Sequence, residues 1–514
     1  MRPPVPPALG PAASAPTPTF ASLGWGPPAG TRWLAALFLV LASLPARAQE
    51  PESRPESRPS TRPELLTPGA ESGPASRPRR PRRQRPESGP ESRGDTRPDS
   101  RAESKPVESP FLAIVNGTIY PVSGPVIRQG TLLIKNDKII EVGRNVQVPP
   151  DARIIDARNK HVAPGFVAVR AVGTFGTSFP ARGEEKQADQ ANPFSQTMLM
   201  ALASGITTVC EGGTQTPQGQ LGGFIGKHTF GSLDGMSVRE PAAVFLQYSG
   251  GDMSARYQTR ETLQKAVEQR AKLKFYYADV AAGKAGVKAP TADEGVKNFV
   301  RVMEGELPCI VQGSTSLDLE GLAELSLDFD LPLVILDARE AWTMTGRLAR
   351  AKISVILTPR QRGEGGNEPT RFHEDPSGWS IETGAKLEAA GVPWCVRSLS
   401  PFVSTGGIAG RDLMQLNMDA AFTVRGGATD DAALRSVTLA AAEILKVSDR
   451  LGSLQPGRDA DLCIFDLEPL DNRSFAETVF VNGKIVYEKD KCSFFNHIQT
   501  DRAKGLKGRW WDER

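Results

Sequence analysis

Short apolar runs alternate with stretches of helical periodicity through residues 164–450, and this alternation constrains the fold more than any other feature. Apolar residues recur at helical spacing in stretches such as Thr262–Leu273 and Leu319–Leu327. Runs of strand length lie between such stretches, at residues 206–209, 309–311, 333–336, 353–357 and 394–396. A repeated strand-then-helix order is typical of a parallel sheet, and at this length a barrel is its natural closure. The sequence therefore predicts an α/β fold with a TIM-like (β/α) barrel.

The two ends of this region carry β-hairpin patterns instead. Turn pairs at Asn116-Gly117 and Asn136-Asp137 interrupt apolar runs before the barrel, and Asn482-Gly483 interrupts another run after it. Neither end alone has enough strands to bury a face, so we expect residues 111–163 and 451–490 to form one small composite β-sandwich domain. The predicted barrel at residues 164–450 is thus bracketed by strands from both sides.

The first 110 residues read as a targeting and linker region. Arg32 precedes the apolar run Trp33–Leu44, and Ala46-Arg47-Ala48 supplies an A-x-A cleavage site, which indicates a signal peptide over residues 1–48 and an exported, periplasmic or extracellular protein. An uncleaved membrane anchor is the alternative, although the run is short for a bilayer. Residues 49–110 repeat Pro, Glu, Ser and Arg and contain almost no aliphatic residues, which predicts a disordered linker. Residues 491–514 form a C-terminal tail.

Composition excludes several classes of partner and site. Lys plus Arg number 62 and Asp plus Glu number 59, so the charge balance gives no case for nucleic acid as the partner. The 5 Cys are widely separated and most sit in apolar runs, where they are expected to be buried small residues rather than a zinc or redox motif. Only 4 His occur, namely His161, His228, His373 and His497.

Motifs on both sides of the predicted barrel carry a family resemblance. Gly130–Gly143, Ile155-Asp156-Ala157 and Val162–Phe166 lead into it, Ala203–Val209 and Leu221-Gly222-Gly223 fall early in it, and Leu451–Leu462 leads out of it. These segments resemble the amidohydrolase superfamily, in its imidazolonepropionase- and dihydroorotase-like branch, over residues 111–490. The resemblance implies hydrolysis of C–N bonds, or of related ring amides and esters, by one or two divalent metals such as zinc at the C-terminal mouth of the barrel.

The positions that match the superfamily's metal ligands hold other residue types. The resemblance places two histidines, two residues apart on one strand, soon after Pro164-Gly165; here those positions are Arg170 and Val172. The later ligand positions match Gln312, Ala338 and Leu399. A guanidinium is permanently cationic and an aliphatic side chain has no lone pair, so we expect no metal cofactor. His228 is the one histidine expected near the mouth, and Lys227 beside it is expected to be solvated.

Two functions follow, from different classes. The first is a non-catalytic, metal-less homologue that binds a ligand or pairs with an active amidohydrolase paralogue. The alternative is a metal-dependent hydrolase of non-peptide carbon–nitrogen bonds with an atypical site. For the first, a small carboxylate or phosphate suits the cations and amides expected at the mouth, and the ligand-binding candidates are Arg170, Gln312, Arg339, Arg397, Glu211 and His228. Alternatively, the arginines pair with Asp337, Glu340 or Glu211 and fill the cavity. No stable membrane insertion is expected after signal cleavage.

Overall fold

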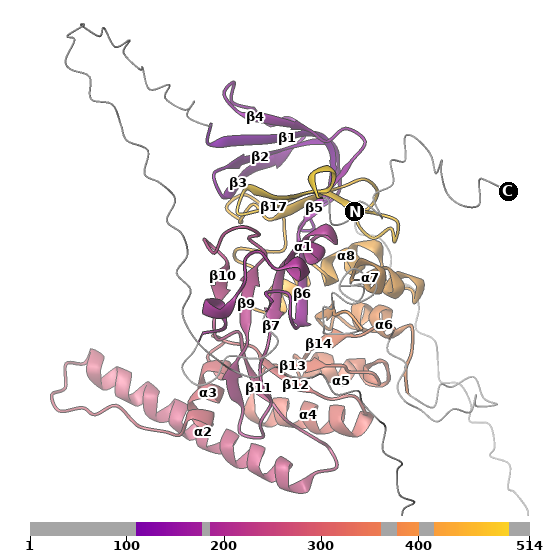
Figure 1. The fold of residues 1–514 in the computed structure, drawn as a ribbon. Coiled ribbons are helices and arrows are strands. Elements are labelled where there is room, and N and C mark those ends of the chain that lie inside the picture. The colour runs from indigo at the N-terminus through magenta and orange to yellow at the C-terminus, as the bar shows by residue number, and fades with distance from the viewer. Residues whose placement is uncertain (1–108, 177–185, 361–377, 400–415, 493–514) are drawn as a thin grey trace, which may run out of the picture. The chain divides into compact units, whose positions relative to one another are not determined.

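The computed structural model describes residues 109–176, 186–360, 378–399 and 416–492, and Figure 1 shows their arrangement. The predicted signal peptide, nearly all of the linker and tail, and both His373 and His497 lie outside these residues. None of the described helices is long and apolar enough to cross a membrane.

Strands from the two ends of the described chain share one sheet. In this eight-stranded sheet the order is β18-β17-β16-β5-β1-β2-β3, and β4 pairs with β1. The strands are β1 (Phe111–Ile119), β2 (Ile127–Lys135), β3 (Lys138–Gly143), β4 (Arg153–Asp156), β5 (His161–Pro164), β16 (Leu462–Phe465), β17 (Ala476–Val481) and β18 (Lys484–Glu488). The antiparallel pairing of β16 with β5 joins the halves, with Cys463 opposite Ala163.

Two of the three predicted turns close hairpins. Asn136 lies between β2 and β3, and Asn482-Gly483 lies between β17 and β18, each residue with a positive φ that suits Asn and Gly. The turn predicted at Asn116-Gly117 is wrong. Here β1 continues to Ile119, and the positive φ of Asn116 falls where the register with β2 shifts, so the pair makes an irregularity within a strand.

The middle of the chain forms two further sheets. One is four-stranded in the order β10-β9-β7-β6 and the other six-stranded in the order β15-β14-β13-β12-β11-β8. The strands are β6 (Phe166–Ala171), β7 (Ile206–Glu211), β8 (Gln220–Gly222), β9 (Phe224–Lys227), β10 (Ser237–Arg239), β11 (Ala243–Leu246), β12 (Cys309–Gln312), β13 (Leu333–Leu336), β14 (Ser354–Leu357) and β15 (Trp394–Val396). Strands β11 to β15 are parallel, as is β6 with β7, while β8, β9 and β10 pair antiparallel. The fold is therefore α/β with mixed sheets.

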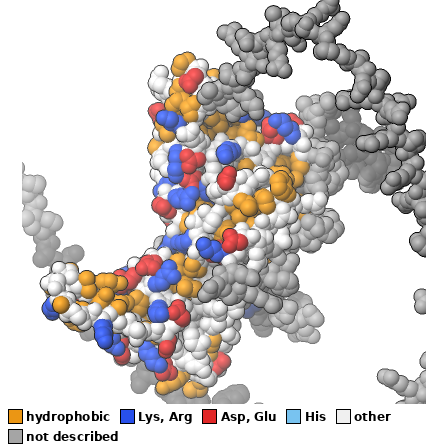
Figure 2. All heavy atoms as spheres, turned by 60° about the vertical axis from the view of Figure 1, so that its left-hand side comes forward, with side chains coloured by type: hydrophobic (Ala, Val, Ile, Leu, Met, Phe, Trp, Pro, Cys, Tyr) orange, Lys and Arg blue, Asp and Glu red, His pale blue; other side chains and the backbone are white. Residues whose placement is uncertain are grey.

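Helices follow most of the parallel strands. They are α1 (Gln196–Ala203), α2 (Met253–Ala281), α3 (Glu294–Met303), α4 (Ser316–Phe329), α5 (Thr345–Arg350), α6 (Thr383–Ala389), α7 (Leu416–Arg425), α8 (Asp430–Ser436) and α9 (Leu439–Ile444), with short 3-10 turns at Gln187–Gln190, Ala341–Thr343 and Lys489–Lys491. Local sequence fixes several starts: Thr315 and Asp318 form a capping box at α4, and Asp252 caps α2. Figure 2 shows one face of the molecule, with hydrophobic side chains among Lys and Arg.

Alternate residues of the central strands enter two different apolar clusters. Phe166 and Ala168 on β6 join the larger cluster with the helices, whereas Val167 and Val169 face the other way. The second cluster takes one set of side chains from both central sheets, including Ile225, Ile310 and Ile356. Between β6 and β15, α9 contacts both strands, and the Val437 carbonyl accepts a hydrogen bond from Val167 (2.8 Å). The two sheets thus share one apolar interior.

Candidate functional site

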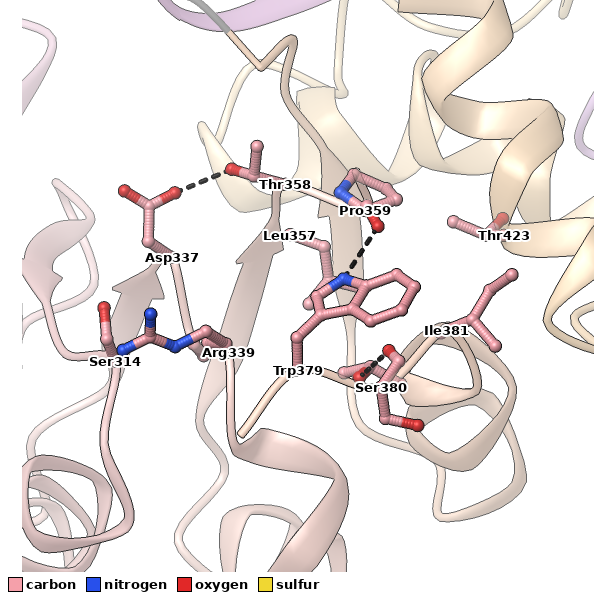
Figure 3. Close-up of a pocket in the computed structure, with 13 residues that line it drawn as sticks. Ser314, Asp337, Arg339, Leu357, Thr358, Pro359, Trp379, Ser380, Ile381 and Thr423 are labelled. Carbon is pink, nitrogen blue, oxygen red and sulfur yellow. Dashed lines mark hydrogen bonds between the residues drawn. The ribbon is translucent and has the colours of Figure 1, made fainter. Parts of the chain in front are cut away.

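Polar residues follow the C-terminal ends of four neighbouring parallel strands. Ser314 follows β12, Asp337 and Arg339 follow β13, Thr358 follows β14 and Arg397 follows β15. Because parallel strands end at one edge of a sheet, these residues are brought together from segments far apart in the chain. A pocket opens at this edge, lined by Ser314, Asp337, Arg339, Thr358 and Trp379 among others (Figure 3). The described residues that line it are the best candidate for a functional site.

Asp337 and Arg397 form a two-point ion pair beside the pocket. Arg397 Nε and Nη2 each lie 2.9 Å from an Asp337 carboxylate oxygen, and both side chains are about 10% exposed or less. Thr358 donates to the same carboxylate (2.7 Å) and accepts from Arg397 Nε (3.0 Å). Parallel N–H···O bonds of this kind combine charge with fixed geometry. The charge of Arg397 is therefore neutralised by Asp337, as one of the two interpretations of the sequence predicts.

Arg339 has a different environment two residues after Asp337. Its side chain lines the pocket and is half-buried, and its Nε atom is buried without a hydrogen-bond partner among the described residues. Figure 3 shows the guanidinium beside Ser314. Trp379 lines the same pocket, and its Nε1 donates to the Pro359 carbonyl (2.9 Å). A buried N–H group without an acceptor is costly, and an acceptor in the pocket would relieve that cost.

Arg170 lies near this pair but is held by carbonyl groups. Its Nη1 donates to the carbonyls of Gly212 (2.6 Å) and Gly213 (3.3 Å), and the guanidinium stacks on the Phe245 ring at 5.2 Å. Burial lowers the pKa of Arg170, and the charge of Arg397 lowers it further. Its φ of 60° falls where the β6–β7 register shifts, which is an uncommon conformation for a residue with a side chain.

The other positions matched to metal ligands lie in different environments. Gln312 is exposed and lines a second pocket with Tyr248 and Asp318, and Leu399 is 38% exposed. Ala338 is fully buried at the first pocket. Among the described residues no group of three His, Cys, Asp or Glu side chains is placed to hold a metal ion. The strand-end residues that are described, two arginines and an aspartate already paired with one of them, do not fit a divalent cation.

Glu211 and His228 are closed from solvent in the four-stranded sheet. Glu211, the last residue of β7, accepts hydrogen bonds from the Thr174 backbone N–H (2.6 Å) and the Thr174 hydroxyl, and burial raises its pKa to about 7. The prediction that His228 lies near the mouth is wrong. Its Nδ1 contacts the carbonyl of Ile206 (2.8 Å), at the opposite end of β7, and burial lowers its pKa to about 4.

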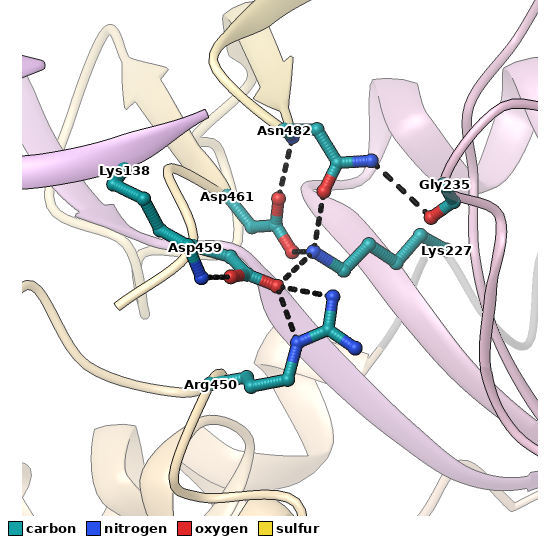
Figure 4. Close-up of polar contacts among 7 residues, drawn as sticks. All are labelled: Lys138, Lys227, Gly235, Arg450, Asp459, Asp461 and Asn482. Carbon is teal, nitrogen blue, oxygen red and sulfur yellow. Dashed lines mark hydrogen bonds and ion pairs between the residues drawn. The ribbon is translucent and has the colours of Figure 1, made fainter. Parts of the chain in front are cut away.

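The expectation that Lys227 is solvated is also wrong. This side chain is fully buried, and its Nζ lies 2.6 Å from Asp459, 2.8 Å from Asp461 and 2.6 Å from Asn482 Oδ1 (Figure 4). Lys138 and Arg450 also pair with Asp459. The cluster links β9 of the four-stranded sheet to β3 and to the segment before β16. The sequence of Phe224–Lys227 gives no sign of this cluster. The whole strand is buried, so it lacks the alternation of apolar and polar residues that would mark a buried face.

Sequence reasoning also gave too little weight to several pocket residues. The sequence indicates Asp337 as a possible partner of the arginines, but it does not single out Ser314, Thr358 or Trp379. The available signal was position: Ser314 and Thr358 come within two residues of the end of a buried strand. Trp379 has no such signal, because it lies in a segment without regular structure and reaches the pocket only through the tertiary fold.

Comparisons with known proteins agree on one family. A model of the amidohydrolase family matches residues 332–487. A dihydroorotase of Anaeromyxobacter dehalogenans is 42% identical over 102 residues, which cover 20% of this chain and 21% of that protein. Amidohydrolase TasK of Hapsidospora irregularis is 22% identical over 422 residues, covering 73% of this chain and 41% of that protein. The chain thus spans less than half the length of either relative.

One solved structure supports the same assignment at the level of the fold. An amidohydrolase from Thermotoga maritima superposes with a TM-score of 0.58 at 24% identity, covering 74% of this chain and 100% of that chain. The family-model match, residues 332–487, includes the strands β13, β14 and β15 and the motif Leu451–Leu462 that leads out of the central sheets. Residues 332–487 thus match the amidohydrolase family model, and the described chain has an amidohydrolase-like α/β fold.

Proposed function

We propose that this protein is a non-catalytic, metal-independent member of the amidohydrolase superfamily that binds a small anionic ligand at the strand-end pocket. One observation carries the proposal: the Arg339 guanidinium lines the pocket beside a closed Arg397–Asp337 pair, and its buried Nε has no hydrogen-bond partner among the residues that the structure describes. A carboxylate or phosphate oxygen would accept from Arg339, and its charge would be balanced by the surrounding cations. Trp379 offers an apolar wall to the remainder of such a ligand.

Electrostatics argues against a metal at the same place. Arg170 matches the first metal-ligand position and is a half-buried cation. At an effective dielectric constant near 20, two unit charges about 4 Å apart repel by about 4 kcal/mol, and a divalent ion doubles that value. The carboxylate of Asp337 cannot offset this repulsion, since Arg397 already neutralises it.

Several broader features are proposed on the sequence and resemblance alone. The two central sheets with their common interior are proposed to be a distorted (β/α) barrel, and the eight-stranded sheet to be the composite β-sandwich domain. Export after cleavage of the signal peptide, the domain boundaries given above, and pairing with an active amidohydrolase paralogue belong to the same proposal.

Metal analysis of the purified mature protein is the direct test. We expect no stoichiometric zinc, nickel, manganese or iron, no change in melting temperature with EDTA, and no turnover of dipeptides, hydantoins, dihydropyrimidines or lactones. A metal content near one per chain, lost with EDTA together with a hydrolytic activity, would overturn the proposal in favour of a metal-dependent hydrolase of carbon–nitrogen bonds.

A further inference from the structure

The helix α2 is the longest described helix, and its last part lies beyond the elements that pack on it. At 29 residues it is about 43 Å long. Its buried residues, such as Leu263 and Ala266, end at Gln269, where Gln269 Nε2 donates to the Pro290 carbonyl of the returning chain (3.0 Å). In Figure 1 the end of α2 and the loop after it extend beyond α3. Most side chains of the tip of this arm, residues 270–288, are exposed, although Arg270 pairs with Glu304 and the side of the helix that carries Lys274 and Tyr277 lines a hollow shared with α3.

Aromatic and aliphatic side chains are concentrated on this tip. Phe275 is 74% exposed, Tyr277 is 63% exposed, and Val280 is half exposed. Phe275 and Tyr277 are two residues apart, so they point about 200° apart around the helix axis. The apolar surface therefore surrounds the tip rather than forming one flat face. Three large exposed side chains within six residues nevertheless concentrate apolar surface at the tip, and concentrated apolar surface is a feature of interaction sites.

The charge of the tip is positive. Lys272, Lys274 and Lys288 are exposed, and no ion pair holds any of them among the described residues, whereas Asp279 is paired with Lys284 (2.5 Å). Hydrophobic and basic side chains lie side by side in the lower part of Figure 2. Side chains of this composition suit an interface where aromatic rings sit at the level of lipid headgroups and lysines meet phosphates.

We propose that the tip of α2, residues 270–288, docks on the surface of an anionic phospholipid membrane. Lipid headgroups can enclose side chains that point in opposite directions, which a rigid protein face does less readily. A second copy of the chain is disfavoured as the occupant, because two tips in contact would bring Lys272, Lys274 and Lys288 together with their counterparts. This inference is independent of the strand-end pocket and of whether the protein is catalytic.

Vesicle co-sedimentation of the whole chain tests the proposal. We expect binding to phosphatidylcholine vesicles that contain about one third phosphatidylglycerol, weakening with salt, and little binding to phosphatidylcholine alone. The double variant K272E/K274E should lower binding at least about tenfold, since each lysine near an anionic surface contributes about 1 kcal/mol and the substitution adds repulsion. F275S/Y277S should lower it several-fold at unchanged charge.

The matched control is R128E/R153E, which makes the same change in net charge at two exposed positions of the eight-stranded sheet. It should keep the binding of the unsubstituted protein. An equal loss of binding in this control would overturn the proposal. Full binding by K272E/K274E would also overturn it, because binding would then be assigned to another basic segment such as residues 77–85. A dimer in light scattering that F275S/Y277S converts to a monomer would assign the tip to a second copy instead.

Discussion

Buried charges occur in both central sheets, and the two sheets neutralise them to different degrees. In the four-stranded sheet, Lys227 is fully buried between Asp459 and Asp461, and Glu211 is fully buried against Thr174. At the strand ends of the six-stranded sheet, the Arg397–Asp337 pair keeps about a tenth of its surface exposed. Beside it, the Nε of Arg339 has no hydrogen-bond partner within the described part of the chain.

The difference separates a structural use of charged residues from a binding use. A closed group whose polar atoms are satisfied internally offers nothing to a ligand, and its removal is felt in stability. A partly open group that includes an N–H donor without an acceptor lowers the stability of the free protein. A bound ligand can supply the missing acceptor. Substitutions in the two sheets should therefore differ in their effects on stability and on binding.

Replacing Lys227 by Met should have the largest effect. The substitution leaves Asp461 buried without its cation, so we expect the free energy of unfolding in urea to fall by about 4 kcal/mol. Lys138→Met removes a half-exposed partner of the same Asp459 and should cost less than about 1 kcal/mol. Equal losses in the two variants would mean that the cluster is not a closed structural unit.

Glu211 should make stability depend on pH. Its folded pKa of about 7 lies above the ordinary value of 4.5 because of burial. The contribution of Glu211 to the free energy of unfolding is therefore fully present below about pH 4.5. It is lost as pH rises through about 7, and the total loss is roughly 3 kcal/mol. Glu211→Gln should lack this loss, whereas exposed Glu306→Gln should retain it.

The test takes the difference in stability between the Glu211→Gln variant and the unsubstituted protein at each pH. His228 is present in both proteins, so its opposite pH dependence cancels. Burial lowers the pKa of His228 to about 4, so its contribution is present above about pH 6.5 and falls as pH drops toward 4. Melting temperatures at several values between pH 5 and pH 8 give the difference. Parallel profiles for Glu211→Gln and the unsubstituted protein would show that Glu211 is ionised in the folded state at all these values.

Replacing Arg397 by Met should have an intermediate effect. Asp337 would keep Thr358 as a donor, and water in the pocket could reach its carboxylate, so we expect a loss of about 2 kcal/mol in unfolding free energy. Adding Asp337→Asn should recover part of it, because the unpaired charge is then removed. A double variant as unstable as the sum of both single variants would show that the two side chains are not coupled.

Replacing Arg339 by Ala should change stability least and binding most. We expect unfolding free energy within about 0.5 kcal/mol of the unsubstituted protein, because no described hydrogen bond of its Nε is lost. Calorimetric titration with inorganic phosphate should show weaker binding by about tenfold, the loss of one charge-assisted contact. Arg350→Ala, an exposed arginine on α5, should bind phosphate unchanged, and an equal effect there would contradict the pocket assignment.

Much of the secondary structure followed from the sequence. Apolar runs such as Leu333–Leu336 became buried strands, and the helical periodicity of Leu319–Leu327 falls within α4. The turns at Asn136 and at Asn482-Gly483 formed as predicted, because positive φ values are locally favourable there. At Asn116 the same local preference produced an irregularity within a strand, since pairing with β2 and β4 extends β1 on both sides.

The sequence by itself determined the residue types at the strand ends, and with them that Arg170, Ala338 and Leu399 cannot ligate a metal. Only the tertiary structure decided which of the charged residues are open to a ligand. In the sequence, nothing distinguishes the surroundings of Lys227 from those of Arg339. In the structure, Lys227 is enclosed by two aspartates, whereas Arg339 lines a pocket. Enclosure depends on segments more than 200 residues apart, as between Lys227 and Asp459, and local periodicity carries no information about such contacts.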